Sequence, residues 1–286
     1  MTVASPGAPA VSSAAPSRAA EGRPRRRAMA GAVGWRLLGV GVFLLLWEIA
    51  ALVADSRAVL PGPLDVVIDF GGSFFDDPGL RYLGVRTPGY AINIGFTVGL
   101  SIVAWFAGSV LGAIVGLLSA RSQIVRNVSE PLLFVFGAVP ALVLAPFFLV
   151  WFGQEPISKM VLVAFYCFVS VGLVAQSAAL AFPPSSEEYA ATQGLRARAR
   201  FLHVIVPGTL PAVLSGLRIA LATAIAVQAT VELLGSQFGV GRLIALRATQ
   251  GDVSSVLGLS IALGVVAIFL DFVLRRVIRS LTRWQQ

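Results

Sequence analysis

The sequence carries little charge. Only 13% of its 286 residues are Asp, Glu, Lys or Arg, whereas 57% are hydrophobic and the mean hydropathy is +0.84. Soluble globular proteins contain about 25% charged residues. A water-soluble fold built from this chain would lack the polar side chains needed to cover its surface, so the composition indicates an integral membrane protein.

Cysteine, histidine and lysine each occur once. Cys167 cannot form an internal disulfide, and together with His203 it falls short of the ligand set of a structural metal site. The phosphate-binding loop Gly-x4-Gly-Lys-Ser/Thr needs a lysine directly after a glycine, whereas Lys159 follows Ser158. We therefore expect no metal site, no cofactor and no ATP site of that type in this chain.

Motifs for enzyme chemistry are scarce as well. The sequence has no Gly-x-Ser-x-Gly elbow, and no hydrophobic run carries paired carboxylates at helical spacing. We therefore predict no catalytic residue and interpret the chain as something other than an enzyme.

The net charge of +8 is due to arginine, since 22 basic residues less the one lysine leaves 21 arginines. They cluster between the hydrophobic runs rather than on one polar face. This pattern is typical of membrane topology and not of a phosphate-binding surface. We expect contact with membrane lipid and no nucleic-acid partner.

Long hydrophobic runs dominate what remains, and a spanning helix needs about 20 mostly apolar residues. The runs lie at about 37–54, 93–119, 131–152, 159–182, 211–235 and 255–274. The sequence thus predicts an all-α, polytopic integral membrane protein with six transmembrane helices. Pro140 and Pro146 are expected to kink the third span.

The chain divides into a tail and a transmembrane domain. Residues 1–30 are rich in Ala, Pro, Ser and Arg and lack hydrophobic periodicity, which predicts a disordered tail before a domain at 31–286. A secretory signal peptide is the alternative interpretation. Its apolar region would be about 7–15 residues long, shorter than the run at 37–54, which favours a retained first span.

The charges between the runs predict the orientation. With a cytoplasmic N-terminus, the inner segments hold 15 arginines and 4 acidic residues, and the outer segments hold 6 basic and 7 acidic residues. The inner segments are the tail, 120–130, 183–210 and the end of the chain from Arg275, and the outer ones are 55–92, 153–159 and 236–254. Both termini are therefore predicted to be cytoplasmic. The first outer segment also predicts a short amphipathic helix over residues 65–75.

The inner segment 183–210 predicts a compact helix–turn–helix, which we call the cytoplasmic knob. Ser185 and Glu188 have the spacing of a capping box at the start of a short helix. Gly194 either breaks that helix or lets another backbone approach closely. A second short helix is expected to end before Pro207.

The order of residues in the knob resembles the loop shared by permease subunits of ATP-binding-cassette (ABC) importers. The matching residues are Glu188, Ala190, Gly194, Val204 and Pro207. Tyr189 departs from the family pattern, where alanine is usual, and Val204 stands where isoleucine is common. Over about residues 36–283, the chain is similar to the type I permeases for nitrate, sulfonates and taurine. That similarity rests on Leu60-Pro-Gly-Pro63, Glu130-Pro-Leu-Leu133, Val139-Pro140, Trp151-Phe-Gly153 with Ser158-Lys159, Gly216-Leu-Arg218 and Gly239-Val-Gly241.

The resemblance implies a bacterial inner-membrane permease that works by alternating access. ATP and Mg would be bound by two separate ATPase subunits, which would also hydrolyse the ATP. The implied ATPase-coupling residues are Glu188, Ala190, Ala191, Gly194, Leu195, Arg196, Ala197, Arg198 and Pro207. A second permease copy or a similar subunit would complete the pathway, and an extracytoplasmic substrate-binding protein would deliver the substrate. The implied substrate is a small organic or inorganic anion such as a sulfonate, taurine, nitrate or an aromatic acid, although similar permeases also serve pyrimidine-type vitamin precursors.

Polar residues inside the spans are candidates for the pathway, because ionisable groups in hydrocarbon are costly. Gln228 and Glu232 lie one turn apart near the outer end of the fifth span, and Val139 and Pro140 begin the stretch 139–146 that we interpret as pathway-lining. The alternative for Glu232 is an ion pair with an arginine of the following outer segment, at position 242 or 247. Elsewhere, Arg218 is expected to reach toward the cytoplasm as a structural anchor, and Asp271 to pair with Arg275 one turn later.

Two other functions compete with an importer permease. An ATP-independent secondary transporter or channel would show internal inverted repeats and a mid-membrane ion site, and no clear repeat is visible. It would also leave the knob without a role. A membrane enzyme or structural anchor is the other hypothesis, and only detection of a chemical activity would support it.

Overall fold

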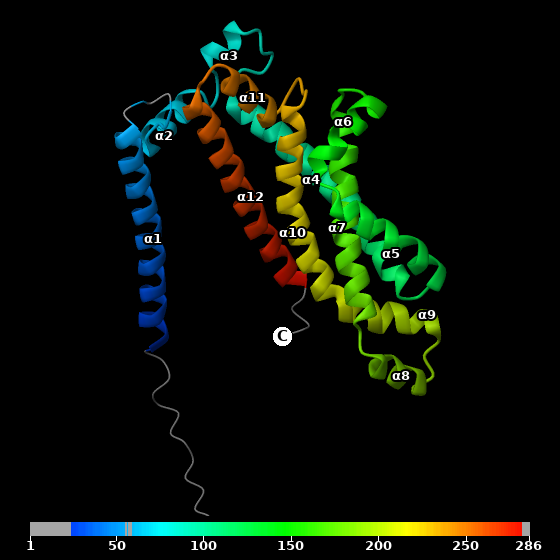
Figure 1. Ribbon diagram of the computed structural model, residues 1–286. Helices are drawn as coiled ribbons and strands as arrows, with labels where there is room; N and C mark the ends of the chain where they lie inside the picture. Colours follow the sequence, from blue (N-terminus) through cyan, green and yellow to red (C-terminus); the bar gives the residue numbers. More distant parts are fainter. Residues whose placement is uncertain (1–23, 55, 57–58, 282–286) are drawn as a thin grey trace, which may run out of the picture.

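The protein is a bundle of long helices with short helices at both ends (Figure 1). The computed structural model describes residues 24–54, 56 and 59–281, and within these ranges there is no β-strand. The helices are α1 (Pro24–Ala54), α2 (Pro63–Gly72), α3 (Pro78–Tyr82), α4 (Tyr90–Ser119), α5 (Gln123–Ala138), α6 (Ala141–Phe152), α7 (Pro156–Leu180), α8 (Pro184–Thr192), α9 (Ala197–Arg200), the π-helical turn η1 (Phe201–Ile205), α10 (Val206–Leu233), α11 (Val240–Thr249) and α12 (Val253–Leu281). The described residues provide five helices long and apolar enough to span a membrane, and six if α5 and α6 form one broken span, as predicted.

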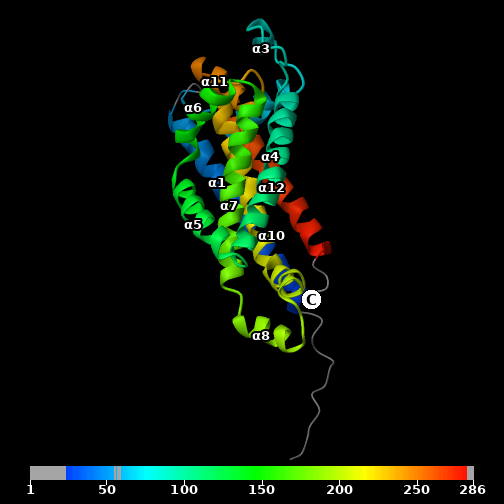
Figure 2. The ribbon, with the colours of Figure 1, turned by 90° about the vertical axis from the view of Figure 1, so that its right-hand side faces the viewer.

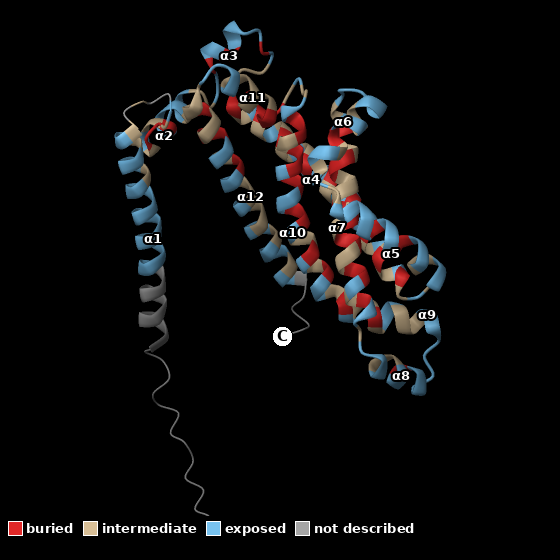
Figure 3. Cartoon of the chain, in the orientation of Figure 1, coloured by how far each residue is buried: buried red, intermediate tan, exposed pale blue. Residues whose placement is uncertain are grey.

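The centre of the bundle is the contact of α4 with α7. Gly108, Gly112 and Gly116 follow one another at every fourth position of α4 and so share one face. A Cβ at Gly108 would lie 2.0 Å from the carbonyl oxygen of Ala164, and one at Gly112 would lie 2.3 Å from that of Phe168. The absence of side chains therefore lets the two backbones touch, which is how small residues stabilise helix pairs in membranes. Figure 3 shows the buried residues concentrated on α4, α7 and α10.

The predicted third span is broken in two. α5 and α6 meet at 104°, with the break between Ala138 and Ala141. Pro140 is the N-cap of α6, so the kink predicted there is confirmed and is sharper than a kink in one helix. Pro146 lies inside α6, and the kink predicted at this residue stays a prediction.

The first span stands at the edge of the bundle (Figures 1 and 3). α1 starts at Pro24, within the tail predicted for residues 1–30, and residues 1–23 lie outside the described part. Proline is favoured in a first helical turn, and the arginines and alanines that follow are good helix formers. Near its outer end, the Trp47 indole nitrogen donates to the carbonyl of Pro61 at 3.0 Å.

Short helices cover one end of the bundle. The amphipathic helix predicted over residues 65–75 is confirmed as α2, whereas α3 and α11 were not predicted. Asp77 caps α3 by accepting from the backbone N–H of Gly79 at 2.9 Å, and its carboxylate also pairs with Arg247 of α11. Arg247 reaches Asp252 as well, at 3.3 Å. These ion pairs connect the segment between α2 and α4, which contains α3, to the turn between α11 and α12.

The pKa values of this cluster follow from burial and charge. Burial alone would raise the pKa of the Asp77 carboxyl, but the hydrogen bonds from Arg247 and Leu80 and the Arg247 charge outweigh it, so the pKa lies below 3.8. Burial alone would lower the pKa of Arg247, and its contacts with Asp77 raise it above the ordinary value instead. Both groups are charged at neutral pH.

The knob, the start of α1 and the end of α12 lie at one end of the molecule, and α2, α3 and α11 lie at the other (Figures 1 and 2). Because the start of α1 and the end of α12 lie at the same end, the chain crosses the membrane an even number of times, provided that α5 and α6 together count as one crossing. The end that holds the knob is the one predicted to be cytoplasmic.

Candidate functional site: the knob and the buried polar cluster

The first limb of the knob is α8, which is closed by Gly194. The backbone N–H of Leu195 donates to the carbonyl of Ala190 at 3.3 Å, and that of Gly194 donates to the carbonyl of Ala191 at 2.9 Å. This pair of bonds is a Schellman motif, and it requires the left-handed conformation found at Gly194, with φ of 80°. A Cβ at Gly194 would meet no atom within 4 Å, so the glycine serves the backbone conformation rather than a close approach.

The start of α8 differs from the prediction. Pro183 is the N-cap, and no side chain forms a cap hydrogen bond, so the capping box predicted from Ser185 and Glu188 is wrong. The helix begins instead with Pro184 in its first turn, where the missing N–H has no cost.

The second limb continues directly into the membrane. α9 passes through the π-helical turn η1 into α10, and the segment Ala197–Leu233 is one helical rod of 37 residues. The prediction that the second helix ends before Pro207 is therefore wrong. Pro207 lies in the first turn of α10, next to the π-helical turn, whose wider hydrogen-bonding pattern accommodates a residue without an N–H. Movement of this limb consequently moves α10.

The knob presents its predicted coupling residues at the surface, and α8 lies beyond the ends of the spans (Figures 1 and 2). Ala190 is buried against the rest of the knob, and Pro207 is half-buried. The exposed ones are Glu188, Ala191, Gly194, Leu195, Arg196, Ala197 and Arg198. Between the two limbs is a hollow of about 460 Å³, which Tyr189 and Val204 help to line. Tyr189 is 70% exposed, so this departure from the family pattern changes the outer surface and not the packing.

A second group of polar side chains is buried at the end of α10 opposite the knob. The Glu232 carboxylate accepts from the Thr97 hydroxyl at 2.8 Å, from the Gln228 amide at 2.9 Å and from the backbone N–H of Gly241 at 3.1 Å. Glu232 and Gln228 are both fully buried. In this conformation they face protein, and their lining of a pathway stays a prediction.

The buried cluster holds the N-terminus of α11. Thr97 also accepts from the backbone N–H of Val240 at 2.9 Å, and Asn93 accepts from that of Gly239 at the same distance. A carboxylate at this end of a helix is favoured by the unpaired N–H groups and by the helix dipole. Sequence reasoning missed Asn93 and Thr97, although two polar residues one turn apart in an apolar run were a visible signal.

The arginines proposed as partners of Glu232 are engaged elsewhere. Arg242 donates to the carbonyl of Gln237, and Arg247 pairs with Asp77 and Asp252. The alternative interpretation of Glu232 as half of an ion pair with one of these arginines is therefore wrong, because the N-terminus of α11 occupies its carboxylate.

At the inner end, α10 and α12 are joined by an ion pair. The Arg218 Nε lies 2.9 Å from Asp271 Oδ1, and Arg275 contacts the other carboxylate oxygen. The predicted local pair of Asp271 with Arg275 is confirmed. Arg218 pairs with Asp271, and its predicted reach toward the cytoplasm stays a prediction.

The predicted pathway residues at the α5–α6 break are partly accessible. Pro140 is exposed and Val139 is half-buried, with its carbonyl accepting from the Tyr166 hydroxyl. A broken helix exposes backbone groups that need partners, and such backbone is tolerated in membranes where it is buried in protein or lines water. The lining role of this stretch stays a prediction.

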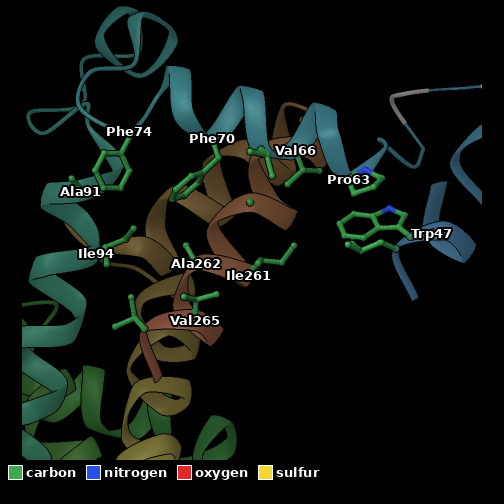
Figure 4. Close-up of a pocket in the computed structure, with 14 residues that line it drawn as sticks. Trp47, Pro63, Val66, Phe70, Phe74, Ala91, Ile94, Ile261, Ala262 and Val265 are labelled. Carbon is green, nitrogen blue, oxygen red and sulfur yellow. The ribbon is translucent and has the colours of Figure 1, made fainter. Parts of the chain in front are cut away.

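An apolar groove of about 530 Å³ lies between α1, α2, α4 and α12 (Figure 4). Its lining includes Trp47, Phe70, Phe74, Ile94 and Ile261, and Figure 4 shows their side chains around it. Apart from the Trp47 indole, which is already bonded to Pro61, the lining side chains are hydrocarbon. The groove therefore offers no group that would recognise a polar solute.

The fold and the knob together define a polytopic helical membrane protein with an exposed docking element at one end. Residues 108–285 match the family of binding-protein-dependent transport system inner membrane components, and the chain belongs to this family. It is accordingly the permease subunit of an ABC importer and a multi-pass inner-membrane protein. This membership does not favour the secondary transporter or channel considered from the sequence.

Relatives match along most of the chain. ThiX of Halalkalibacterium halodurans, a formylaminopyrimidine transport permease protein, is 27% identical and covers 86% of this chain and 93% of its own length. SsuC of Bacillus subtilis, named for aliphatic sulfonate transport, is 28% identical over 88% of each chain. TauC of Escherichia coli, the taurine transport system permease protein, is 28% identical over 86% of this chain and 89% of its own.

Solved structures share the fold. An inward-facing structure of the MetNI methionine ABC transporter matches with a TM-score of 0.60 and 18% identity, covering 71% of this chain and 98% of that chain. An amino acid ABC transporter matches with a TM-score of 0.55 and 16% identity, over 71% of this chain and 95% of that one. The chain therefore shares the arrangement of its helices with these solved structures.

Proposed function

We propose that this chain forms the translocation pathway of an ATP-driven importer and has no ATPase activity of its own. Two ATPase subunits, which bind ATP and Mg, would dock on the cytoplasmic knob. A second copy of the chain or a similar subunit would frame the pathway, and a substrate-binding protein would dock at the end formed by α2, α3 and α11. Both termini are then cytoplasmic.

The observation that carries the proposal is the knob. Seven of its nine predicted coupling residues are exposed, its turn is fixed by Gly194, and its second limb is continuous with α10. A helical pair held outside the membrane and joined rigidly to a span is suited to convert the movement of a bound partner into movement of that span.

The first test replaces Gly194 with leucine. A side chain at φ of 80° strains the backbone and opens the Schellman motif, so we expect the permease to insert in the membrane while its ATPase no longer copurifies with it. Gly251→Leu is a matched control, because Gly251 has φ of 72° and open space around it but lies between α11 and α12, at the opposite end. Normal copurification of the Gly194→Leu variant would contradict the proposal.

For the substrate, we propose a small organic or inorganic anion, such as a sulfonate, taurine, nitrate or an aromatic acid. The names of SsuC and TauC support a sulfonate, whereas ThiX, at nearly the same identity, is named for a formylaminopyrimidine. Calorimetric titration of the substrate-binding protein that docks on this permease distinguishes the two. Taurine or an alkanesulfonate should bind, and binding of a formylaminopyrimidine alone would overturn the anion proposal.

A further inference from the structure

Arg121 connects the knob to the corner between α4 and α5. Its Nη1 donates to the carbonyl of Ala197, at the start of α9, at 2.7 Å. Its guanidinium carbon also lies 6.0 Å from the ring centre of Phe201, the first residue of η1, within reach of a cation–π contact. One side chain thus touches two successive elements of the knob from a segment 76 residues earlier in the chain.

The backbone that carries Arg121 is itself fixed. The N–H groups of Arg121 and Ser122 both donate to the carbonyl of Leu118, in the last turn of α4, at 3.0 Å. The Ser122 hydroxyl in turn caps α5 by accepting from the N–H of Val125 at 3.3 Å. A displacement of the guanidinium end is therefore passed to the start of α5 rather than absorbed by a loose loop.

The space around this contact is not filled by packing. A hollow of about 270 Å³ separates the corner from the knob, and its lining includes Arg121, Glu187, Arg200 and Phe201. Since hydrocarbon packing does not fill this space, the guanidinium bridges it directly.

We propose that Arg121 is a positioning residue that transmits movement of the knob to α5 and, through it, to the break at Pro140. This inference rests on the proposed function, because it assumes that an ATPase moves the knob. α5 runs from the corner to Ala138, directly before the break, and contains Pro131. Movement of the knob then reaches the bundle by two routes, along the continuous helix into α10 and through the Arg121 contact into α5. Chains of hydrogen bonds and packed side chains of this kind can carry coupling between distant sites.

The test uses the full complex with its ATPase, reconstituted in liposomes. The reporter is Val143→Cys, because Val143 is 66% exposed just after the break, and the native Cys167 is buried at 1% exposure. Its labelling by an impermeant maleimide is compared without nucleotide and with a non-hydrolysable ATP analogue, and ATP hydrolysis and copurification of the ATPase are measured alongside. The variants are Arg121→Ala and Arg121→Lys. Arg126→Ala is the control, since it removes the same charge nearby and its 2.8 Å bond to Gln123 stays within α5.

We expect Arg121→Ala to keep its ATPase and hydrolyse ATP while the nucleotide-dependent change in labelling falls about five-fold, the effect of losing roughly one hydrogen bond. Arg121→Lys should restore part of that change, because its ammonium can still donate to the Ala197 carbonyl. An undiminished change in Arg121→Ala, or an equal loss in Arg126→Ala, would overturn the proposal. Loss of ATPase copurification in Arg121→Ala would also overturn it, since Arg121 would then act on docking. A wild-type complex that lacks its ATPase or shows no response to nucleotide would instead refute the proposed function.

Discussion

Replacement of Glu232 tests whether the buried cluster holds α11 in place. Glu232→Ala removes one carboxylate and leaves three donors without an acceptor: the Thr97 hydroxyl, the Gln228 amide and the backbone N–H of Gly241. Each buried donor left unsatisfied costs about 1–3 kcal/mol, and breaking one side of a buried charged network typically costs about 3–5 kcal/mol. We therefore expect a loss of about 3–5 kcal/mol of stability in this variant.

Glu232→Gln should cost far less, for a reason visible in the structure. The Gln228 Oε1 is buried and lacks a hydrogen-bond partner among the described residues. If the Gln228 amide turns over, this oxygen accepts from the new amide at position 232, while the amide oxygen still accepts from Thr97 and Gly241. Glu232→Gln then loses only the extra strength that a charged acceptor gives to hydrogen bonds at the N-terminus of α11, about 1 kcal/mol of stability.

Thermal unfolding in detergent and backbone hydrogen exchange measure these effects. At about 2–4 °C per kcal/mol, we expect the apparent Tm to fall by about 10 °C in Glu232→Ala and by a few degrees in Glu232→Gln. Exchange should accelerate at residues 239–241 in Glu232→Ala and stay unchanged along α7. Equal Tm values for wild type and Glu232→Ala, or equal damage from both variants, would refute the assignment of Glu232 as the cap of α11.

Two further predictions concern the outer ion pair and the α4–α7 contact. The pKa of Asp77 is lowered in the folded protein, so its contribution to stability is present at neutral pH and is lost as the pH falls through that lowered pKa. Asp77→Asn should therefore have a lower Tm than wild type at pH 7 and converge with it in acid, and parallel Tm curves from pH 7 downward would contradict this. Gly112→Leu would place a Cβ 2.3 Å from the Phe168 carbonyl oxygen and should abolish the folded, monodisperse peak in size-exclusion chromatography. Gly99→Leu is the control, because a Cβ at Gly99 on the same helix meets no atom within 4 Å and the variant should keep that peak. Similar yields of the two variants would exclude the close contact of α4 and α7.

The spans could be predicted from the sequence because each is a long apolar run, and length and hydropathy suffice to identify a helix in a membrane. The turn at Gly194 could be predicted as well, since a glycine after a polar helical stretch is a strong signal for a C-terminal cap. The break at Pro140 was visible as a proline, but its angle of 104° depends on how α6 packs against α7 and was not visible.

The role of Glu232 could not be predicted because its partners are distant in sequence. Thr97 lies 135 residues earlier, and α11 follows Glu232 after a turn whose direction the sequence does not encode locally. A buried acid in a span is compatible with a pathway residue, an ion pair or a helix cap, and only the positions of the neighbouring helices separate these. The same holds for Arg121, whose partners on the knob become neighbours only when the spans have packed.

The second limb of the knob and the buried cluster around Glu232 lie at the two ends of one continuous helical segment. The rod Ala197–Leu233 begins at the Arg121 contact and ends one residue after Glu232, and at about 1.5 Å per residue its 37 residues extend roughly 55 Å. A tilt imposed on its end at the knob would therefore displace its opposite end, to which Glu232 ties α11. Because Arg247 of α11 also holds Asp77, the displacement reaches the segment between α2 and α4 at the outer surface. If a separate ATPase moves the knob, as proposed, the hydrogen-bonded contacts at both ends of α10 would carry that movement to the opposite end of the molecule.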